Sequence, residues 1–153
     1  MAINVEHINP FIMASVKMLK DVCQIDATVG KATVKEAAFT EDVTIIMIGV
    51  TGEMKGQVMI EFKNEIACDI ASKMTMMPIT VLDELATSAI CELGNMILGN
   101  AATIFSTKGI EIDITPPTTC KGNVVFVTSY SANICVPLIY EGNKQIDINI
   151  AII

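Results

Sequence analysis

A stripe of polar and small side chains recurs every three or four residues in the middle of the chain, at Ser88, Glu92, Asn95 and Gly99. On a helix these residues share one face, and Glu92 and Asn95, three apart, project from the same patch. A carboxylate only accepts hydrogen bonds, whereas an amide both accepts and donates them. A glycine inside a helix costs about 0.5–1 kcal/mol relative to alanine, and here it leaves bare backbone beside Asn95. The stripe therefore predicts hydrogen-bonding chemistry toward another surface that approaches closely.

An ordinary solvated helix face is the alternative explanation, because Glu and Asn are common at exposed positions. The Glu-x-x-Asn spacing occurs three times, at residues 6–9, 61–64 and 92–95. The first pair precedes Pro10 and is expected to lie off the helix, and the second is expected at the end of a strand. Only the third pair lies within a predicted long helix, which makes it the candidate site.

Other reactive side chains fit structural roles better. Cys91 has no adjacent base and lies off the polar stripe, so we expect a buried thiol there. Asp83 and Glu84 suit the first turn of a helix, where carboxylates compensate the helix dipole. His7, the one histidine of the chain, is expected to be solvated ahead of the first helix, and a multi-histidine metal site is excluded. We therefore expect no metal on this chain.

Charge and composition exclude several functional classes. Ten basic residues, all Lys, stand against seventeen acidic ones for a net charge of −7, so nucleic acid is not an expected partner. Apolar runs such as residues 43–50 are far shorter than the roughly 20 residues of a membrane span, and no signal peptide is evident. The five widely spaced cysteines form no Cys-x-x-Cys pair, which favours small buried side chains in a reducing cytoplasm.

Local patterns predict the elements that lead to the stripe. Asn9 can cap a first helix, with Pro10 at its first position. β-Branched residues at 43–50 and 57–62 flank a turn bounded by glycines, which predicts a hairpin. Asn64 is then expected to cap a short helix.

The helix that carries the stripe is predicted to be the longest element. Thr80 can cap it and Lys108 with Gly109 can end it, which leaves about 27 residues between them. Its predicted apolar face consists of Leu82, Leu85, Ala89, Leu93, Met96, Ile97, Ala101 and Ile104. Strands are expected at 110–114, 124–128, 134–140 and 146–150, with hairpin turns at 121–123 and 141–144. Residues 1–153 are thus predicted to form a single α+β domain, with a mostly antiparallel sheet packed against two long helices.

The segment 88–102, Ser-Ala-Ile-Cys-Glu-Leu-Gly-Asn-Met-Ile-Leu-Gly-Asn-Ala-Ala, resembles the signature of the CheC/CheX/FliY family of chemotaxis phosphatases. That signature has Asp or Ser, Glu four residues on, Asn three further and a downstream proline, for which Pro116 and Pro117 are suitably placed. The hairpin at 48–58 and the start of the chain at 9–12 are similar to the family as well. A single copy of the motif resembles CheX more than CheC, which carries two.

The resemblance implies a CheC-like fold and hydrolysis of the phosphoaspartate on a CheY-like receiver domain. Asn95 would orient the attacking water and Glu92 would pair with the receiver's lysine, with Ser88 and Gly99 contacting the partner. The Mg²⁺ of the reaction would be held by the receiver, with no cofactor on this chain. The main alternative is a non-catalytic receiver-binding or self-associating domain of the same fold, and a further one is a structural component related to the flagellar switch.

Two further expectations concern surfaces. The strand-rich C-terminal third ends in residues 150–153 with few charges to protect an open edge. Together with the resemblance, this favours a homodimer that extends the sheet. The loop Met74-Thr-Met-Met77, where relatives often have a glycine, can form a soft binding surface, but we expect it to pack on the core.

Overall fold

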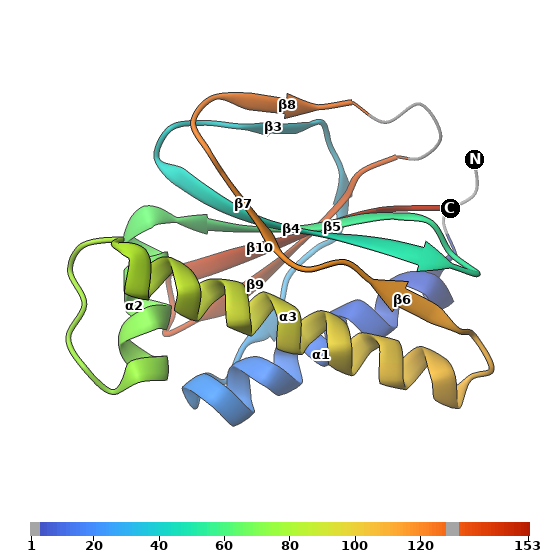
Figure 1. Ribbon diagram of the computed structural model, residues 1–153, viewed down its shortest axis with the longest axis horizontal. Helices are drawn as coiled ribbons and strands as arrows, with labels where there is room; N and C mark the ends of the chain where they lie inside the picture. The colour runs from blue at the N-terminus through green and yellow to red at the C-terminus, as the bar shows by residue number, and fades with distance from the viewer. Residues whose placement is uncertain (1–3, 128–131) are drawn as a thin grey trace.

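In the computed structural model of the protein, the described part of the chain forms three helices on one side of a large antiparallel sheet (Figure 1). The structure describes residues 4–127 and 132–153. Within these ranges the main sheet has eight strands, and a two-stranded sheet lies over part of its opposite face (Figure 1). The predicted α+β class, with a mostly antiparallel sheet against two long helices, is confirmed.

The elements follow one another with short connections. The helices are α1 (Val5–Cys23), α2 (Asn64–Thr75) and α3 (Glu84–Thr107). The main sheet contains β1 (Thr28–Val29), β2 (Thr33–Val34), β4 (Val43–Gly52), β5 (Gly56–Lys63), β6 (Ile112–Ile114), β7 (Thr118–Lys121), β9 (Ile134–Tyr140) and β10 (Lys144–Ile152). The second sheet pairs β3 (Ala37–Phe39) with β8 (Val124–Phe126). The order of the main sheet is β1-β9-β10-β5-β4-β6, with β2 also on β9 and β7 also on β4.

The predicted hairpin is the pair β4 and β5, in register from Val43 opposite Lys63 to Val50 opposite Gly56. Gly56, at the end of its turn, has to be glycine because β10 passes close to it. A Cβ on Gly56 would lie 2.0 Å from the carbonyl oxygen of Ala151. The hairpin thus supplies a rigid centre for the sheet.

The main core fills the space between the helices and the sheet. Phe11 of α1 and Phe105 of α3 meet edge to face, with ring centroids 5.1 Å apart, so the two long helices pack on each other as well as on the sheet. Gly94 lets α3 approach the sheet closely, because a Cβ there would lie 3.0 Å from Ile46 Cγ2. These contacts fix the height and rotation of α3.

A smaller core lies on the other face of the sheet. Phe39 and Phe126 cover buried residues of β4 and β5, including Ile45 and Met59. The predicted hairpin turn at 121–123 joins β7 to β8, but these strands pair with β4 and β3 in different sheets. That part of the prediction is wrong because each strand finds its partner far away in the sequence. Residue 128, the predicted end of β8, lies outside the described residues.

The first helix begins earlier than predicted. Asn4 is its N-cap, and the Asn4 side chain accepts a hydrogen bond from the backbone N–H of Glu6 at 3.0 Å. Pro10 therefore lies inside α1, where it is buried, and His7 is part of the helix and half-buried. The pair Glu6 and Asn9 consequently lies on a helix rather than off it, contrary to our expectation.

The cap of α2 also differs from the prediction. Lys63 is the N-cap residue, and Asn64 is the first residue of the helix. The Asn64 side chain accepts a hydrogen bond from Thr44 Oγ1 at 2.8 Å instead of capping the helix.

Across the described part of the chain, no helix combines the length and apolar character needed to cross a membrane.

The C-terminal strand is not an open edge. β10 pairs with β9 on one side and with β5 on the other, from Phe62 opposite Ile146 to Gly56 opposite Ile152. The argument for a homodimer from an exposed C-terminal strand is therefore wrong. The path of the main sheet ends instead at β1 and β6, two short strands.

Candidate functional site

The helix α3 carries the predicted site, and its start is set by Asp83. The Asp83 side chain accepts a hydrogen bond from the backbone N–H of Ala86 at 2.9 Å, so Asp83 is the cap, and the predicted cap at Thr80 is wrong. At the other end, Gly109 adopts a φ of 80° and its N–H donates to the carbonyl of Ser106, as a C-terminal glycine should. The helix has 24 residues rather than about 27.

The buried face of α3 is rotated relative to the predicted one. The predicted apolar face is centred near Leu93, and at about 100° per residue the centre of the buried face lies roughly 70° from it. The difference arises because the predicted face left out Ile90, Leu98 and Phe105, three large apolar residues that α3 buries completely. The residues buried on α3 are Ala86, Ile90, Leu93, Gly94, Ile97, Leu98, Ala101 and Phe105.

The polar stripe consequently points almost directly away from the core. Ser88, Glu92 and Asn95 are exposed, as predicted. A Cβ on Gly99 would meet no atom within 4 Å, so this turn of the helix presents bare backbone. Glu92 and Asn95 are held one turn apart on a helix whose opposite face is packed on the sheet.

A groove of about 600 Å³ runs between this stripe and the chain that enters β7. It brings together three of the four predicted residues, Ser88, Glu92 and Asn95, whereas Gly99 is not part of its lining. Pro117, one of the two prolines noted downstream of the motif, lies on the opposite wall. The complete lining is Leu82, Asp83, Glu84, Thr87, Ser88, Cys91, Glu92, Asn95, Pro117 and Lys121.

Sequence reasoning missed Lys121. This residue ends β7, and it lines the groove together with Asp83, the residue that caps α3. Asp83 is 38 positions earlier in the sequence, and no local pattern indicates that the two residues line one groove. The lining contains three carboxylates, those of Asp83, Glu84 and Glu92, and one cation, that of Lys121. The groove is therefore acidic and suits a basic group of a partner.

The walls of the groove are joined by Cys91. Its Sγ lies 3.1 Å from Thr119 Oγ1, which links α3 to β7. The thiol is half-buried rather than buried, contrary to our prediction, although its contact is structural. Cys23, Cys68 and Cys135 are buried as expected, and burial raises the pKa of each thiol, that of Cys23 to about 11.

The methionine loop lies between α2 and α3. Met74 packs against the main core, but Met76 is 91% exposed and Met77 is 49% exposed, so the expectation of a loop packed on the core holds for Met74 alone. Met76 also adopts a positive φ of 57°, a conformation that disfavours side chains other than glycine. The loop is held to α2 by Ser72 Oγ, which accepts from the backbone N–H of Ile79 at 2.9 Å.

The groove can bind and orient a partner through hydrogen bonds, but its residues do not suggest metal chemistry. Among residues 4–127 and 132–153, no cluster of three or more His, Cys, Asp or Glu side chains could hold a metal ion. What the groove offers is an amide and a carboxylate on a rigid, exposed helix face. This arrangement fits contact with a group that another molecule presents.

Comparisons with known proteins agree on one group of relatives. The family model described as chemotaxis phosphatase CheX matches residues 44–138. The CheY-P phosphatase CheX of Thermotoga maritima is 30% identical over 146 residues, which cover 95% of this chain and 94% of that protein. A CheC-like superfamily protein from Shewanella sp. PV-4 has a TM-score of 0.87 and 29% identity, over 99% of both chains. A chain of the solved CheX–CheY–BeF₃–Mg²⁺ complex from Borrelia burgdorferi has a TM-score of 0.83 and 29% identity, over 97% of this chain and 99% of that one.

Proposed function

Because this chain belongs to the chemotaxis phosphatase family CheX, we propose that it hydrolyses the phosphoaspartate of a CheY-like receiver domain. The observation that carries the proposal is the groove, where Glu92 and Asn95 lie exposed on one helix face opposite Pro117. The CheY partner in the Borrelia complex supports the class of substrate.

Asn95 is the residue that we assign to the attacking water. Its amide can accept a hydrogen bond from the water and donate one to a phosphoryl oxygen, as a glutamine does in small GTPases. Orientation of the water for in-line attack is the main requirement, because an acyl phosphate is already reactive. The position of Asn95 on a packed helix means that little ordering of the protein is needed for this contact.

Glu92 is the residue that we assign to docking. Its carboxylate accepts hydrogen bonds only, and a charge-assisted bond to the receiver's lysine would fix the register of the two proteins. Ser88 extends the contact by one turn, and the bare backbone at Gly99 permits close approach. The receiver is expected to hold the Mg²⁺, which neutralises charge on the transferred phosphoryl group.

The test is the release of phosphate from a phosphorylated receiver domain, with and without the protein. Asn95→Ala should lower the rate at saturating protein by about 10²–10³, which corresponds to roughly 3–4 kcal/mol of lost positioning. Glu92→Ala should weaken receiver binding as well as turnover. Both variants should keep the wild-type free energy of unfolding, because neither side chain is buried.

The chain provides matched controls on α1. Glu6 and Asn9 have the same spacing and are both exposed on a long helix, so Glu6→Ala and Asn9→Ala remove the same groups elsewhere. We expect each control to keep turnover within about twofold of the wild type. A wild-type rate in Asn95→Ala and Glu92→Ala would show that the groove is not the active site, and binding without any turnover would favour a non-catalytic receiver-binding domain.

Residues 1–153 are proposed to act as one domain in the cytoplasm, where CheY-like receivers and reduced cysteines are expected. We also propose that the chain forms a homodimer. A dimer that extends the sheet would have to use β1 or β6, the ends of the sheet path. A monomer by light scattering at tens of micromolar protein would contradict it.

A further inference from the structure

The rotation of α3 leaves apolar side chains on its outer face. Leu85 is 50% exposed, and Ala89 and Met96 are half-buried, although all three were expected to belong to the core. Positions 85, 89, 92 and 96 follow one another at helical spacing, so these side chains line the side of Glu92 that faces away from β7. We call Leu85, Ala89 and Met96 the Leu85 ridge.

The outer face of α3 is also poor in charge. Glu84 and Glu92 are the two charged residues among its 24. A helix that faces water permanently is usually rich in charged side chains on that side. When a partner covers this face, the free-energy cost of removing charged groups from water is therefore small. It is confined to the two glutamates, whose charge a cationic partner can neutralise.

We propose that the Leu85 ridge is a docking surface for an apolar patch of the receiver domain, beside the lysine that Glu92 contacts. This inference rests on the proposed function, because the partner must bring its phosphoryl group to Asn95. A stable interface covers about 800 Å² on each partner, a disc with a radius of roughly 16 Å. Leu85 is seven residues from Glu92, about 10 Å along the helix, so such a partner covers the whole ridge.

The ridge contributes affinity rather than chemistry. Its contacts are the same before and during phosphoryl transfer, because the ridge does not face the reacting atoms. Contacts of this kind lower KM and leave kcat unchanged. The Leu85 ridge and Asn95 thus divide the work between receiver binding and turnover.

The experiment compares Leu85→Ser with Met13→Ser, because Met13 is 55% exposed on the outer face of α1. Binding is measured with a receiver domain carrying beryllofluoride and Mg²⁺, and kcat and KM with the phosphorylated receiver. Leu85→Ser should raise Kd and KM about tenfold with kcat unchanged, and Leu85→Met should restore both. Met13→Ser should change neither by more than about twofold.

The outcomes separate this inference from the proposed function. A wild-type Kd and KM in Leu85→Ser, with turnover that still depends on Asn95, overturns the ridge alone. A wild-type protein that neither binds nor dephosphorylates the receiver overturns the proposed function and the ridge with it. A shift from dimer to monomer in Leu85→Ser, with receiver binding unchanged, assigns the ridge to contact between two copies and also overturns the inference.

Discussion

The two long helices each carry an exposed Glu and Asn three residues apart, yet their surroundings differ. On α3, Glu92 and Asn95 line a groove opposite Pro117. On α1, Glu6 and Asn9 lie in the first turns of the helix, directly before the buried Pro10. The same residue types at the same spacing therefore occur in two settings. The pair on α3 lies beside a concave surface that this helix forms with the chain entering β7.

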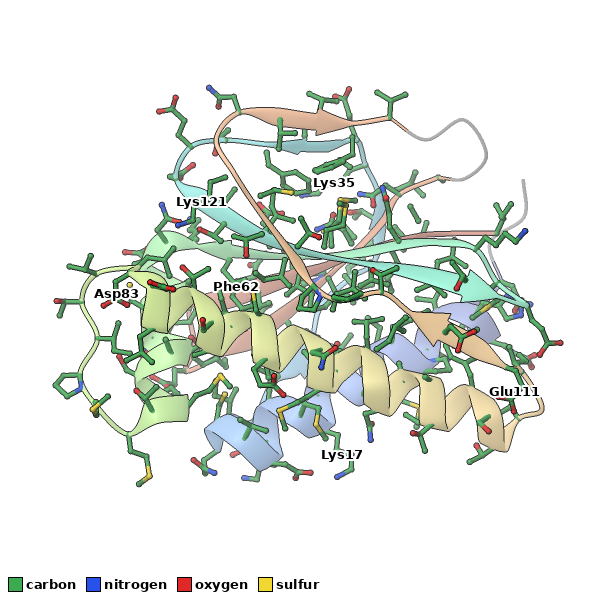
Figure 2. All side chains as sticks on the ribbon, in the orientation of Figure 1. Lys17, Lys35, Phe62, Asp83, Glu111 and Lys121 are labelled. Carbon is green, nitrogen blue, oxygen red and sulfur yellow. The ribbon has the colours of Figure 1, made fainter. Side chains whose placement is uncertain are left out.

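The outer faces of the two helices differ as well. Four of the 19 residues of α1 are charged, and Lys17 and Lys20 form ion pairs with Asp21 and Asp26. Lys17 points away from the sheet into solvent (Figure 2). Two of the 24 residues of α3 are charged, and its outer face includes Gly99 and the Leu85 ridge. The comparison indicates that α1 is built to remain solvated and α3 to be covered.

The most severe test adds a cation to each outer face. Ser88→Lys places an ammonium one turn from Glu92, where it pairs with that carboxylate and repels the receiver's lysine. We expect kcat/KM for the phosphorylated receiver to fall by about 10–100-fold, or roughly 1.4–2.7 kcal/mol. Met13→Lys on α1 should leave kcat/KM within about twofold. Equal effects of the two substitutions would remove the distinction between the helices.

On the buried face of α3, even one added carbon atom is expected to lower the stability of the protein. Gly94→Ala gains about 0.5–1 kcal/mol of helix propensity but overpacks the contact with Ile46, which costs about 1–3 kcal/mol. We expect a net loss of about 1 kcal/mol in the free energy of unfolding, measured in urea. A more stable Gly94→Ala would mean that Ile46 moves aside freely and that this glycine does not set the height of α3.

On the outer face of α3, Gly99→Ala is expected to stabilise the protein, whereas Gly94→Ala is expected to destabilise it. A Cβ on Gly99 meets no atom within 4 Å, so Gly99→Ala should raise the free energy of unfolding by about 0.5–1 kcal/mol. If the bare backbone is needed for close approach, the same variant should bind the beryllofluoride-activated receiver more weakly. Greater stability with unchanged affinity would remove Gly99 from the proposed interface.

The smallest effect is expected on α1. Lys17 and Asp21 form an exposed ion pair one helical turn apart, and such pairs contribute about 0.3–0.5 kcal/mol. Lys17→Ala should therefore change the free energy of unfolding by no more than about 0.5 kcal/mol and leave phosphate release unchanged. A measurable loss of turnover would show that the outer face of α1 also contacts the receiver.

The sequence predicted those features that depend on neighbours in the chain. The hairpin β4–β5 was predicted from β-branched runs around a turn bounded by glycines, and the pairing of the two strands is confirmed. The exposure of Glu92 and Asn95 follows from helical spacing and is confirmed as well. Their roles in binding and hydrolysis stay predictions.

The features that were missed depend on contacts between distant parts of the chain. Periodicity alone placed Leu85 in the core, because apolar residues lie on several sides of α3 and spacing does not show which side packs on the sheet. Thr80 and Asp83 are both good caps, and residue type does not show that Asp83 is the one whose side chain accepts the hydrogen bond from the backbone N–H of Ala86. The sequence did not place Lys121 in the groove, because the residues of α3 that line the groove with it are distant in sequence.

The central place of β10 has a consequence for the kinetics of folding. Its partners on β5 are more than 80 residues earlier in the chain, as in the pair of Gly56 with Ile152. Closing so long a loop costs entropy before the strand pairing repays it, and folds dominated by such contacts reach the native state in about milliseconds to seconds. Until β10 arrives, one side of β5 presents unpaired backbone groups to other chains. We therefore expect aggregation during refolding to increase with protein concentration, and to be suppressed once β10 has paired.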